Sequence, residues 1–491
     1  MVEPTEPAVQ GPRLMSLTPE LLILIFDQCQ FIDLLALSST CRRLNTLRQG
    51  LDTKRIDLDS GARSMHILHG LRSCIAPPKL DRLTVRFSIK AHFAQDLHQL
   101  HTFVSRSGCI HEVRLYFNTG AWFDGRNSAF GPSYRSSLKT LFSMLVESRC
   151  EVLDVRQGHS VAFGDEIAME QRTIFGRKCR AFLRSPMVSI LGLLGIPLTT
   201  LATGCSAKRQ RAMEDRSLRT FRLHSNLFFR RPFYSWMMDM FRKTPITSLS
   251  LQASDVREEE WRSFLGSITI PTLTHVAFLS PYIPFIDMLG FLSRHPRLIS
   301  VYLPPHLPPV KKFPQKWKLS LPSLTTVGGC YAYLRHFLSR SLPFPSLQNI
   351  LLSLPPFKRD IKVITGAVGI MIEHFAPRVL TLEFIFPSAF DELDMYTNKE
   401  YSQSRSFSFP SVEEIKFRSD GSFAFSERTL PLLSPWLATF FPSLTKVSFV
   451  TSCLFCENRV WVEFVKAVEA TCPLVEDVAA YDVEDVRLFD A

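Results

Sequence analysis

The sequence lacks an apolar run long enough to cross a membrane. Its best candidate, residues 187–201, is interrupted by Gly192, Gly195 and Pro197, and it falls short of the roughly 20 apolar residues that a membrane-spanning helix needs. The first residues, MVEPTEPAVQGPR, carry acids and prolines where a secretory signal has basic residues and an apolar segment. The eleven cysteines lie mostly next to apolar residues, which fits reduced thiols better than disulfides. We therefore expect an intracellular protein, in cytoplasm or nucleus, without a membrane partner.

Motifs of catalysis and metal binding are also scarce. The stretch GHSVAFG has Ala162 in place of the second glycine of a serine-hydrolase elbow. Cys453 and Cys456 form a lone C-x-x-C pair, whereas a structural zinc site needs four ligands. The chain has no glycine-rich phosphate loop. The sequence therefore predicts a protein that is not an enzyme and that binds no metal or cofactor.

Charge is distributed unevenly along the chain. The formal net charge is +11 at pH 7, and residues 177–231 alone hold twelve Lys and Arg against two acids. Residues 473–491 hold six acids and one Arg. Within the basic stretch, AKRQR at 207–211 fits either a nuclear signal or a solvated loop. The high pI therefore describes one stretch rather than the whole surface, and no nucleic-acid partner is expected.

Two helices are predicted near the N-terminus. Residues 17–26, LTPELLILIF, place Pro19 and Glu20 where a first helical turn favours them, yet the helix is apolar on all sides. A second helix follows Asp33, with an apolar stripe at Leu34, Leu37, Cys41 and Leu44. A unit of about 45 residues buries too little surface to be stable alone. We therefore expect it to pack on a partner chain, on the rest of this chain, or on both.

These helices resemble the F-box, which combines Leu-Pro-x-Glu, Leu-Leu-x-x-Ile-Phe, Asp-Leu-Leu and Cys-Arg-x-Leu. The residues that match in order and spacing are Leu17, Glu20, Leu21, Leu22, Ile25, Phe26, Asp33, Leu34, Leu35, Cys41, Arg42 and Leu44. The sequence departs from the family at Thr18, where Pro is preferred and Pro19 comes one place late, and at Cys29, where Leu is preferred. The resemblance covers residues 14–48 of the 491.

The resemblance implies a function for these helices. F-box helices dock on a Skp-family adaptor, which joins them to a cullin-RING ubiquitin ligase. The residues implied in adaptor binding are Leu17, Pro19, Leu21, Leu22, Ile25, Phe26, Leu34 and Leu35. An ordinary helical hairpin that packs on the following domain is the alternative.

A short motif recurs through the rest of the chain. It consists of a proline, a spacer, an apolar residue, two variable residues and an apolar-x-apolar strand. The copies begin at Pro271, Pro296, Pro322, Pro345, Pro377, Pro410, Pro442 and Pro473, at intervals of 23 to 33 residues. Weaker copies without the proline lie at 80–87, 110–117, 150–157, 218–225 and 246–253. A fixed motif at such periods indicates a solenoid.

The stretches between the strands, such as 282–296 and 460–473, read as helices that end at a proline. A strand and a helix in each unit resemble the irregular leucine-rich repeats that often follow an F-box. The family's Asn or Cys after the strand is absent. The predicted fold is α/β, with a small all-α F-box followed by an irregular leucine-rich-repeat solenoid that has a parallel sheet on one face. The predicted domains are a disordered tail at 1–13, the F-box at 14–48, a linker at 49–79 and the solenoid at 80–491, with a basic insertion at about 157–217.

Outward-facing strand positions give the predicted target surface. Side chains alternate along a strand, so the residue between two inward apolar positions points outward. The predicted target-binding residues are Arg86, Arg114, Tyr116, Arg222, His224, Tyr302, Glu383, Lys416 and Arg418. The early strands are cationic, which predicts that an acidic or phosphorylated segment of the target binds near Arg114 and Arg222. The alternative is that these positions are only solvated.

Two functions follow from these predictions. The first is a substrate-recognition adaptor of an SCF-type ubiquitin ligase, in which the F-box binds the Skp-family adaptor and the repeats bind a target protein. The second is a leucine-rich-repeat scaffold for protein–protein interaction that is not associated with a ligase.

Overall fold

The chain forms two compact units, Met1–Pro245 and Ile246–Ala491, in a computed structural model. The structure describes residues 17–19, 21–22, 25, 55–59, 80–87, 93–106, 110–117, 132–148, 150–156, 218–229, 233–253, 256–305, 319–340, 344–353, 380–386, 409–424, 430–455 and 458–482. The predicted tail at 1–13, most of the F-box segment and the predicted insertion at 157–217 lie outside these residues. Among the described helices, none is long and apolar enough to cross a membrane.

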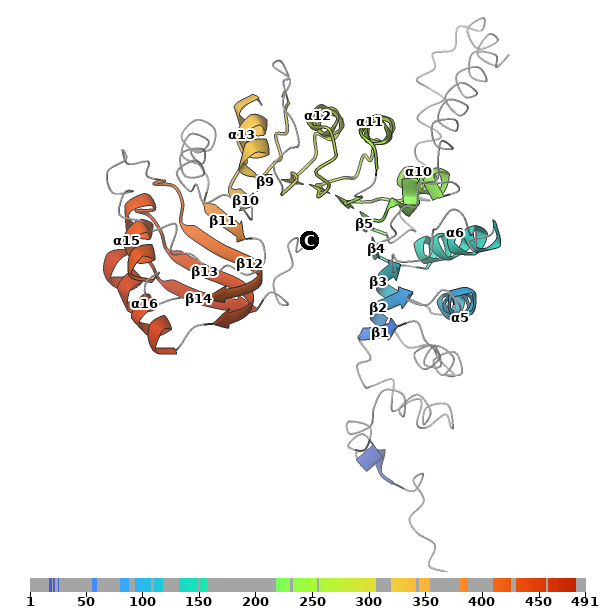
Figure 1. The fold of residues 1–491 in the computed structure, drawn as a ribbon, viewed down its shortest axis with the longest axis horizontal. Coiled ribbons are helices and arrows are strands. Elements are labelled where there is room, and N and C mark those ends of the chain that lie inside the picture. Colours follow the sequence, from blue (N-terminus) through green and yellow to red (C-terminus); the bar gives the residue numbers. More distant parts are fainter. Residues whose placement is uncertain are drawn as a thin grey trace, which may run out of the picture. The chain divides into compact units, whose positions relative to one another are not determined.

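The first unit is a parallel sheet with helices on one side (Figure 1). Its strands are β1 (Arg55–Asp59), β2 (Leu80–Phe87), β3 (Ile110–Phe117), β4 (Val152–Arg156) and β5 (Thr220–His224). Its helices are α5 (Phe93–Arg106), α6 (Pro132–Glu147), the 3-10 helix η3 (Asn226–Phe229) and α10 (Phe233–Lys243). The strands pair in sequence order, and the described crossover helices, α5 between β2 and β3 and α6 between β3 and β4, lie over the same face.

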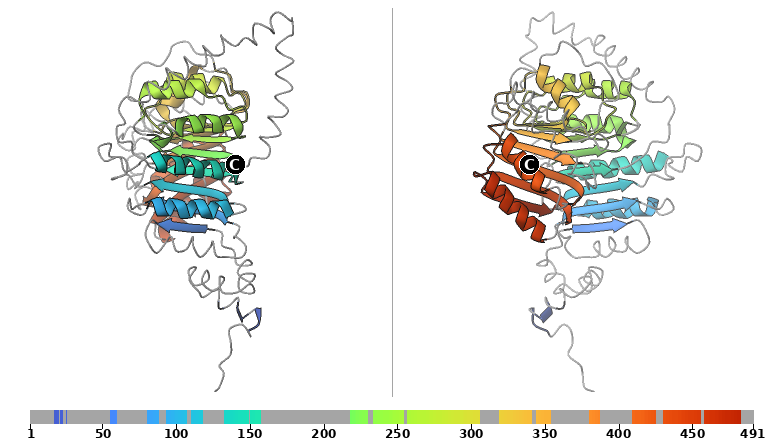
Figure 2. Two further views of the ribbon diagram at one scale, coloured as in Figure 1. Left: turned by 90° about the vertical axis from the view of Figure 1, so that its right-hand side faces the viewer. Right: turned by 60° about the vertical axis from the view of Figure 1, so that its left-hand side comes forward.

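The second unit repeats this arrangement with more strands (Figure 2). Its strands are β6 (Ser248–Leu251), β7 (His275–Phe278), β8 (Ser300–Tyr302), β9 (Thr326–Cys330), β10 (Asn349–Ser353), β11 (Thr381–Phe386), β12 (Glu414–Ala424), β13 (Lys446–Phe455) and β14 (Asp477–Asp482). Its helices are α11 (Glu258–Ser267), α12 (Phe285–Ser293), α13 (Tyr331–Arg340), α15 (Leu430–Phe440) and α16 (Asn458–Thr471). Every neighbouring pair of these strands is parallel.

The core lies between the strands and the helices. The inward apolar positions of successive strands stand in register, as in Leu83, Val113, Leu153 and Phe221 of the first unit, all fully buried. In the second unit the rings of Phe384, Phe417 and Phe449 stack at centroid distances of 5.7 and 5.1 Å. In both units these side chains form a column that runs across the strands. The columns follow from the sequence motif, because an apolar residue recurs at the same place in each copy.

The proline of the motif has a second role that the sequence analysis does not predict. It occupies the second position of a turn that leads into the strand, where its fixed φ is suited. The apolar residue two places later closes the turn, as in the bonds from the Leu273 amide to the Ile270 carbonyl (3.1 Å) and from the Leu444 amide to the Phe441 carbonyl (3.1 Å). The same bond recurs after Pro296, Pro322, Pro345, Pro410 and Pro473. The proline therefore begins a turn as well as ending a helix.

A backbone ladder joins each turn to its predecessor. The Ile299 amide donates to the Thr274 carbonyl (2.7 Å), and the Thr325 amide donates to the Ile299 carbonyl (2.8 Å). Equivalent bonds continue from Gln348 to Thr325 and from Thr445 to Glu413. The ladder extends the strand pairing by one residue on the N-terminal side, so that turn and strand form one rigid element.

The structure places a strand in every predicted copy of the motif, and it adds one that was not predicted. Residues 55–59, RIDLD, form β1 within the predicted linker and pair with Arg82–Arg86 of β2. This segment is short and has no proline turn before it, so the motif did not identify it. Its inward residues, Ile56 and Leu58, are buried, and the sheet therefore begins before residue 80.

Candidate functional site

The sheet face opposite the helices carries the predicted target-binding residues of the first unit. Because Leu83, Val113, Leu153 and Phe221 point into the core, their neighbours point away from it. Two rows of side chains result from the strand register. One row contains Thr84, Arg114, Asp154 and Arg222, and the other contains Arg86, Tyr116, Arg156 and His224. We call these residues, together with Arg82 and Glu112, the arginine face.

Glu112 is the first anionic centre of the arginine face. Its Oε2 accepts a hydrogen bond from Arg82 Nε (2.7 Å), and its Oε1 accepts one from Arg114 Nε (2.8 Å). Burial alone would raise the pKa of Glu112, but the hydrogen bonds from Arg114 and Arg82 outweigh it, so the pKa lies below its usual value. Both arginines are therefore engaged in holding a buried carboxylate.

Asp154 is the second anionic centre, and it is fully buried. Its Oδ2 accepts a hydrogen bond from Arg156 Nε at 2.8 Å. Its Oδ1 has no hydrogen-bond partner among the described residues, and His224 Nδ1 lies 3.9 Å away. Burial lowers the pKa of His224 to about 4, against the attraction of Asp154, so His224 is neutral at pH 7 and adds no positive charge.

Arg222 differs from its neighbours because its guanidinium group donates no hydrogen bond to a described residue. Its Nη1 lies 3.6 Å from Glu112 Oε1 and 3.8 Å from Asp154 Oδ2, and both distances exceed that of a hydrogen bond. Burial lowers the pKa of Arg222 despite the attraction of both carboxylates. In Arg114, by contrast, the hydrogen bond to Glu112 outweighs burial and raises the pKa. Arg222 is thus a half-buried cation whose charge is incompletely compensated.

Tyr116 lies between two arginines. The guanidinium carbons of Arg86 and Arg156 are each 5.6 Å from the centroid of its ring, within the range of cation–π attraction. The ring therefore orients both side chains on the arginine face.

The sequence predicted Arg86, Arg114 and Arg222 on this face and missed Arg82, Arg156 and the two acids, Glu112 and Asp154. The signal was present, since each acid stands two residues before an arginine on the same strand and so faces the same side. Arg114 and Arg222 lie in the same row, and both are close to Glu112 rather than standing free in solvent. The acids turn a simple cationic surface into an ordered network.

In the second unit, two predicted target-binding residues are buried instead of exposed. Tyr302 is only 6% exposed and packs with Ala277 and Leu351, and its hydroxyl contacts Ser353 Oγ at 2.5 Å. The cause lies on the next strand, where a Cβ on Gly328 would come within 2.4 Å of the Tyr302 ring. The missing Cβ lets the ring lie flat across the sheet.

Arg418 is the other buried residue, at 3% exposure. Its Nη1 donates to Glu383 Oε1 at 3.1 Å. Burial raises the pKa of Glu383 in spite of the opposing effects of Arg418 and Lys416. Lys416 is half-exposed and lies 3.4 Å from Glu414. Of the four predicted residues in this unit, Tyr302 and Arg418 are therefore not available as a solvent-facing surface.

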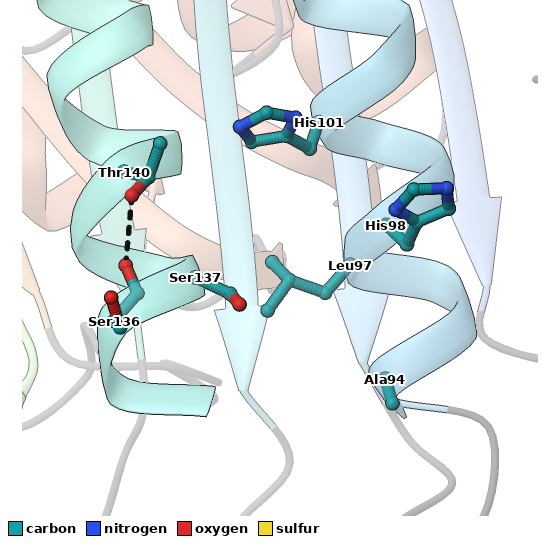
Figure 3. Close-up of a pocket in the computed structure, with 7 residues that line it drawn as sticks. All are labelled: Ala94, Leu97, His98, His101, Ser136, Ser137 and Thr140. Atoms are coloured by element: carbon teal, nitrogen blue, oxygen red, sulfur yellow. Dashed lines mark hydrogen bonds between the residues drawn. The ribbon is translucent and has the colours of Figure 1, made fainter. Parts of the chain in front are cut away.

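A hollow of about 270 Å³ lies on the helix side of the first unit, between α5 and α6 (Figure 3). It is lined by Ala94, Leu97, His98, His101, Ser136, Ser137 and Thr140. The Thr140 hydroxyl donates to the Ser136 carbonyl of its own helix (3.0 Å).

Across the described part of the chain, no group of three or more His, Cys, Asp or Glu residues could hold a metal ion.

The opening helix is described at a few positions. The Leu22 amide donates to the Thr18 carbonyl (3.1 Å), and the Leu22 side chain is fully buried. Leu21 and Ile25 are 48% and 36% exposed, and they lie one helical turn apart, on the same side. Pro19 is also exposed, whereas Leu17 is half-buried. Among the other predicted adaptor-binding residues, Phe26, Leu34 and Leu35 lie outside the described residues.

Comparison with known protein families identifies this segment. Residues 14–47 match the F-box domain. F-box domains generally bind a Skp-family adaptor in SCF ubiquitin ligases, and F-box proteins are typically non-enzymatic substrate receptors. No curated protein matches the chain.

Proposed function

We propose that this chain is a non-enzymatic substrate-recognition adaptor of an SCF-type ubiquitin ligase. Its F-box binds a Skp-family adaptor, and through it a cullin-RING ligase, while the rest of the chain binds a target protein. The observation that carries the proposal is the F-box match at residues 14–47. We place the protein inside the cell, in cytoplasm or nucleus.

The opening helix supports this role by its exposed apolar residues. Leu22 packs inward, whereas Leu21 and Ile25 present apolar surface to solvent. Covering such surface is favourable by about 25 cal/mol for each Å² removed from water. The adaptor-binding residues of the proposal are those on the outer side, Pro19, Leu21 and Ile25, together with Leu17, Phe26, Leu34 and Leu35. Leu22 was also predicted to bind the adaptor, but it is fully buried and is therefore a packing residue of the helix.

For the rest of the chain we propose an irregular leucine-rich-repeat solenoid that presents its open sheet face to the target. Parallel strands that pair in sequence order support this assignment within each unit, and in the second unit β7–β10 and β12–β14 are each reached through a proline turn. Repeat arrays of this type use an extended sheet face for binding. The proposed target-binding residues on that face are Arg86, Arg114, Tyr116, Arg222, His224, Glu383 and Lys416.

The test is affinity purification of the full chain and of a variant without residues 14–48. We expect the full chain to bring down a Skp-family adaptor and a cullin, and the deletion variant to lose both while it retains target proteins. Retention of the adaptor by the deletion variant would overturn the proposal. If neither form binds an adaptor, the chain is a repeat scaffold without a ligase.

A pair of matched variants locates the contact more closely. Replacing Leu21 and Ile25 with Ala removes exposed apolar surface from the F-box, and replacing Val462 and Leu474 with Ala does the same elsewhere, because these two residues are 48% and 53% exposed. We expect the first pair to weaken adaptor binding and the second to leave it unchanged. Equal binding by both variants would show that the opening helix is not the docking surface.

A further inference from the structure

The arginine face holds more positive charge than its own acids compensate. On strands β2 to β5 the described cations of this face are Arg82, Arg86, Arg114, Arg156 and Arg222, whereas the described carboxylates are Glu112 and Asp154. Asp59 of β1 stands opposite Arg86 in register, so the clearest excess lies at the other side of the face, on β4 and β5.

Arg156 on β4 and Arg222 on β5 are adjacent, and they differ in their hydrogen bonds. Arg156 Nε and Arg222 Nη1 approach the same oxygen, Asp154 Oδ2, at 2.8 and 3.8 Å. Arg156 uses only its Nε in this contact, so the terminal nitrogens of its guanidinium group are directed elsewhere. The guanidinium group of Arg222 donates no hydrogen bond to a described residue. The two groups therefore offer several N–H donors beside each other.

These donors can be reached from solvent, whereas the carboxylate between them cannot. The side chains of Arg156 and Arg222 are 36% and 27% exposed, and that of Asp154 is 0% exposed. A ligand that approaches this face meets guanidinium groups, with Asp154 beneath them. Tyr116 holds Arg156 on one side at 5.6 Å, so the donors are oriented before binding.

We propose that Arg156 and Arg222 form a binding site for an oxyanion, a phosphate ester or a carboxylate, carried by a segment of the target protein. The site rests on the proposed function in one respect, namely that the ligand is part of a target chain. Arginine suits such a group because its planar fork donates two parallel hydrogen bonds to carboxylate or phosphate oxygens.

Arg114 and Glu112 act as positioning residues in this site. The hydrogen bond between them (2.8 Å) fixes Glu112, and Glu112 in turn lies 3.6 Å from Arg222. Arg114, which was predicted to bind the target near Arg222, therefore positions the site. Arg156 was not predicted, and it contacts the ligand.

The experiment measures the binding of fluorescent peptides to the full chain by anisotropy. The probes share a Gly-Ser background: one carries a run of glutamates, one carries a single phosphoserine and one is neutral. A single-stranded oligonucleotide is the fourth probe. We expect binding of one or both anionic peptides, with weaker binding as ionic strength rises, and no binding of the neutral peptide. Binding of the phosphoserine peptide alone assigns the phosphate ester, and binding of the glutamate peptide assigns the carboxylate.

The variant Arg156→Gln with Arg222→Gln should bind the anionic peptides about tenfold more weakly or worse. The matched control, Arg242→Gln with Lys243→Gln, removes the same charge from the exposed end of α10 and should bind like the parent chain. Because loss of both arginines leaves Asp154 less compensated, a second variant keeps the charge: Arg156→Lys with Arg222→Lys should fold and still bind several-fold more weakly, since lysine lacks the fork.

Four results would overturn the proposal. They are absence of peptide binding by the parent chain, unchanged binding by the Lys variant, an equal loss in the α10 control, and tighter binding of the oligonucleotide than of either anionic peptide. Adaptor association, measured on the same samples, reports separately on the proposed function. Its absence removes the ligase role even where peptide binding is retained.

Discussion

His295 should make the stability of the second unit depend on pH. The residue is 3% exposed and follows α12. Its Nε2 accepts a hydrogen bond from the Ile270 amide at 2.9 Å, and its Nδ1 lies 2.7 Å from the Phe291 carbonyl oxygen. Nδ1 therefore carries the proton and Nε2 is the acceptor. Protonation would place a second N–H against the Ile270 amide and break the bond that joins the turn before β7 to the end of α12.

The direction of the effect follows from the pKa. Burial lowers the pKa of His295 below its ordinary value of 6.5, although the Phe291 carbonyl opposes the shift. The unfolded chain then binds a proton that the folded chain does not, so stability is fully present above pH 6.5 and is lost as pH falls toward the folded pKa. The slope for one such group reaches about 1.4 kcal/mol per pH unit.

The assay is urea unfolding of the parent chain and of His295→Leu at several pH values. At neutral pH the variant should be less stable by about 1 to 3 kcal/mol, because the Ile270 amide is left without its acceptor. The difference should shrink as pH falls below 6.5, since only the parent loses the stability of a neutral His295. His275, whose pKa is also lowered by burial, is present in both chains and cancels. A difference that stays constant from neutral to acidic pH would refute this reasoning.

Three further predictions concern packing and charge. Gly328→Ala should destabilise the chain by about 1 to 3 kcal/mol, because its Cβ would lie 2.4 Å from the Tyr302 ring; in a Tyr302→Ala background the same substitution should cost less in urea unfolding, and an equal cost in both backgrounds would contradict the contact. Phe417→Ala should cost about 3 to 5 kcal/mol, since it opens a gap between the rings of Phe384 and Phe449, and a cost below about 1 kcal/mol would show that the stack is not tightly packed. Glu112→Gln should lower stability at neutral pH and make stability depend less on pH under acidic conditions. The lowered pKa of Glu112 gives a contribution to stability that is present above pH 4.5 and is lost as pH falls below it. If circular dichroism shows the same acid unfolding in the variant and the parent chain, that result would count against the charge network.

The strands were predictable because their signal is local. A proline turn followed by alternating apolar residues is contained within nine residues, and it identified strands as different as SVY at 300–302 and KVSFVTSCLF at 446–455. β1 has the same alternation at Ile56 and Leu58, without the turn, and it was not predicted.

Burial on the open sheet face was not predictable in the same way, because it depends on residues far apart in sequence. Whether Tyr302 stands in solvent is decided by Gly328 on the next strand and by Ser353 two strands away. Arg418 is covered through its contact with Glu383, 35 residues earlier. Alternation gives the side of the sheet on which a residue lies, but its exposure depends on the sizes of its neighbours in register.

In each unit, backbone hydrogen bonds hold the strands and the residues just before them in a fixed arrangement, whereas the segments between the strands can change in length. The Arg219 and Thr220 amides both donate to the Glu151 carbonyl at 2.9 Å, and β5 pairs in full register with β4, although residues 157–219 lie between these strands. Loop-closure entropy rises only by about 0.6 kcal/mol for each doubling of length. The chain can therefore gain or lose whole segments between strands at little thermodynamic cost, which gives evolution a place to add new recognition elements without redesigning the sheet.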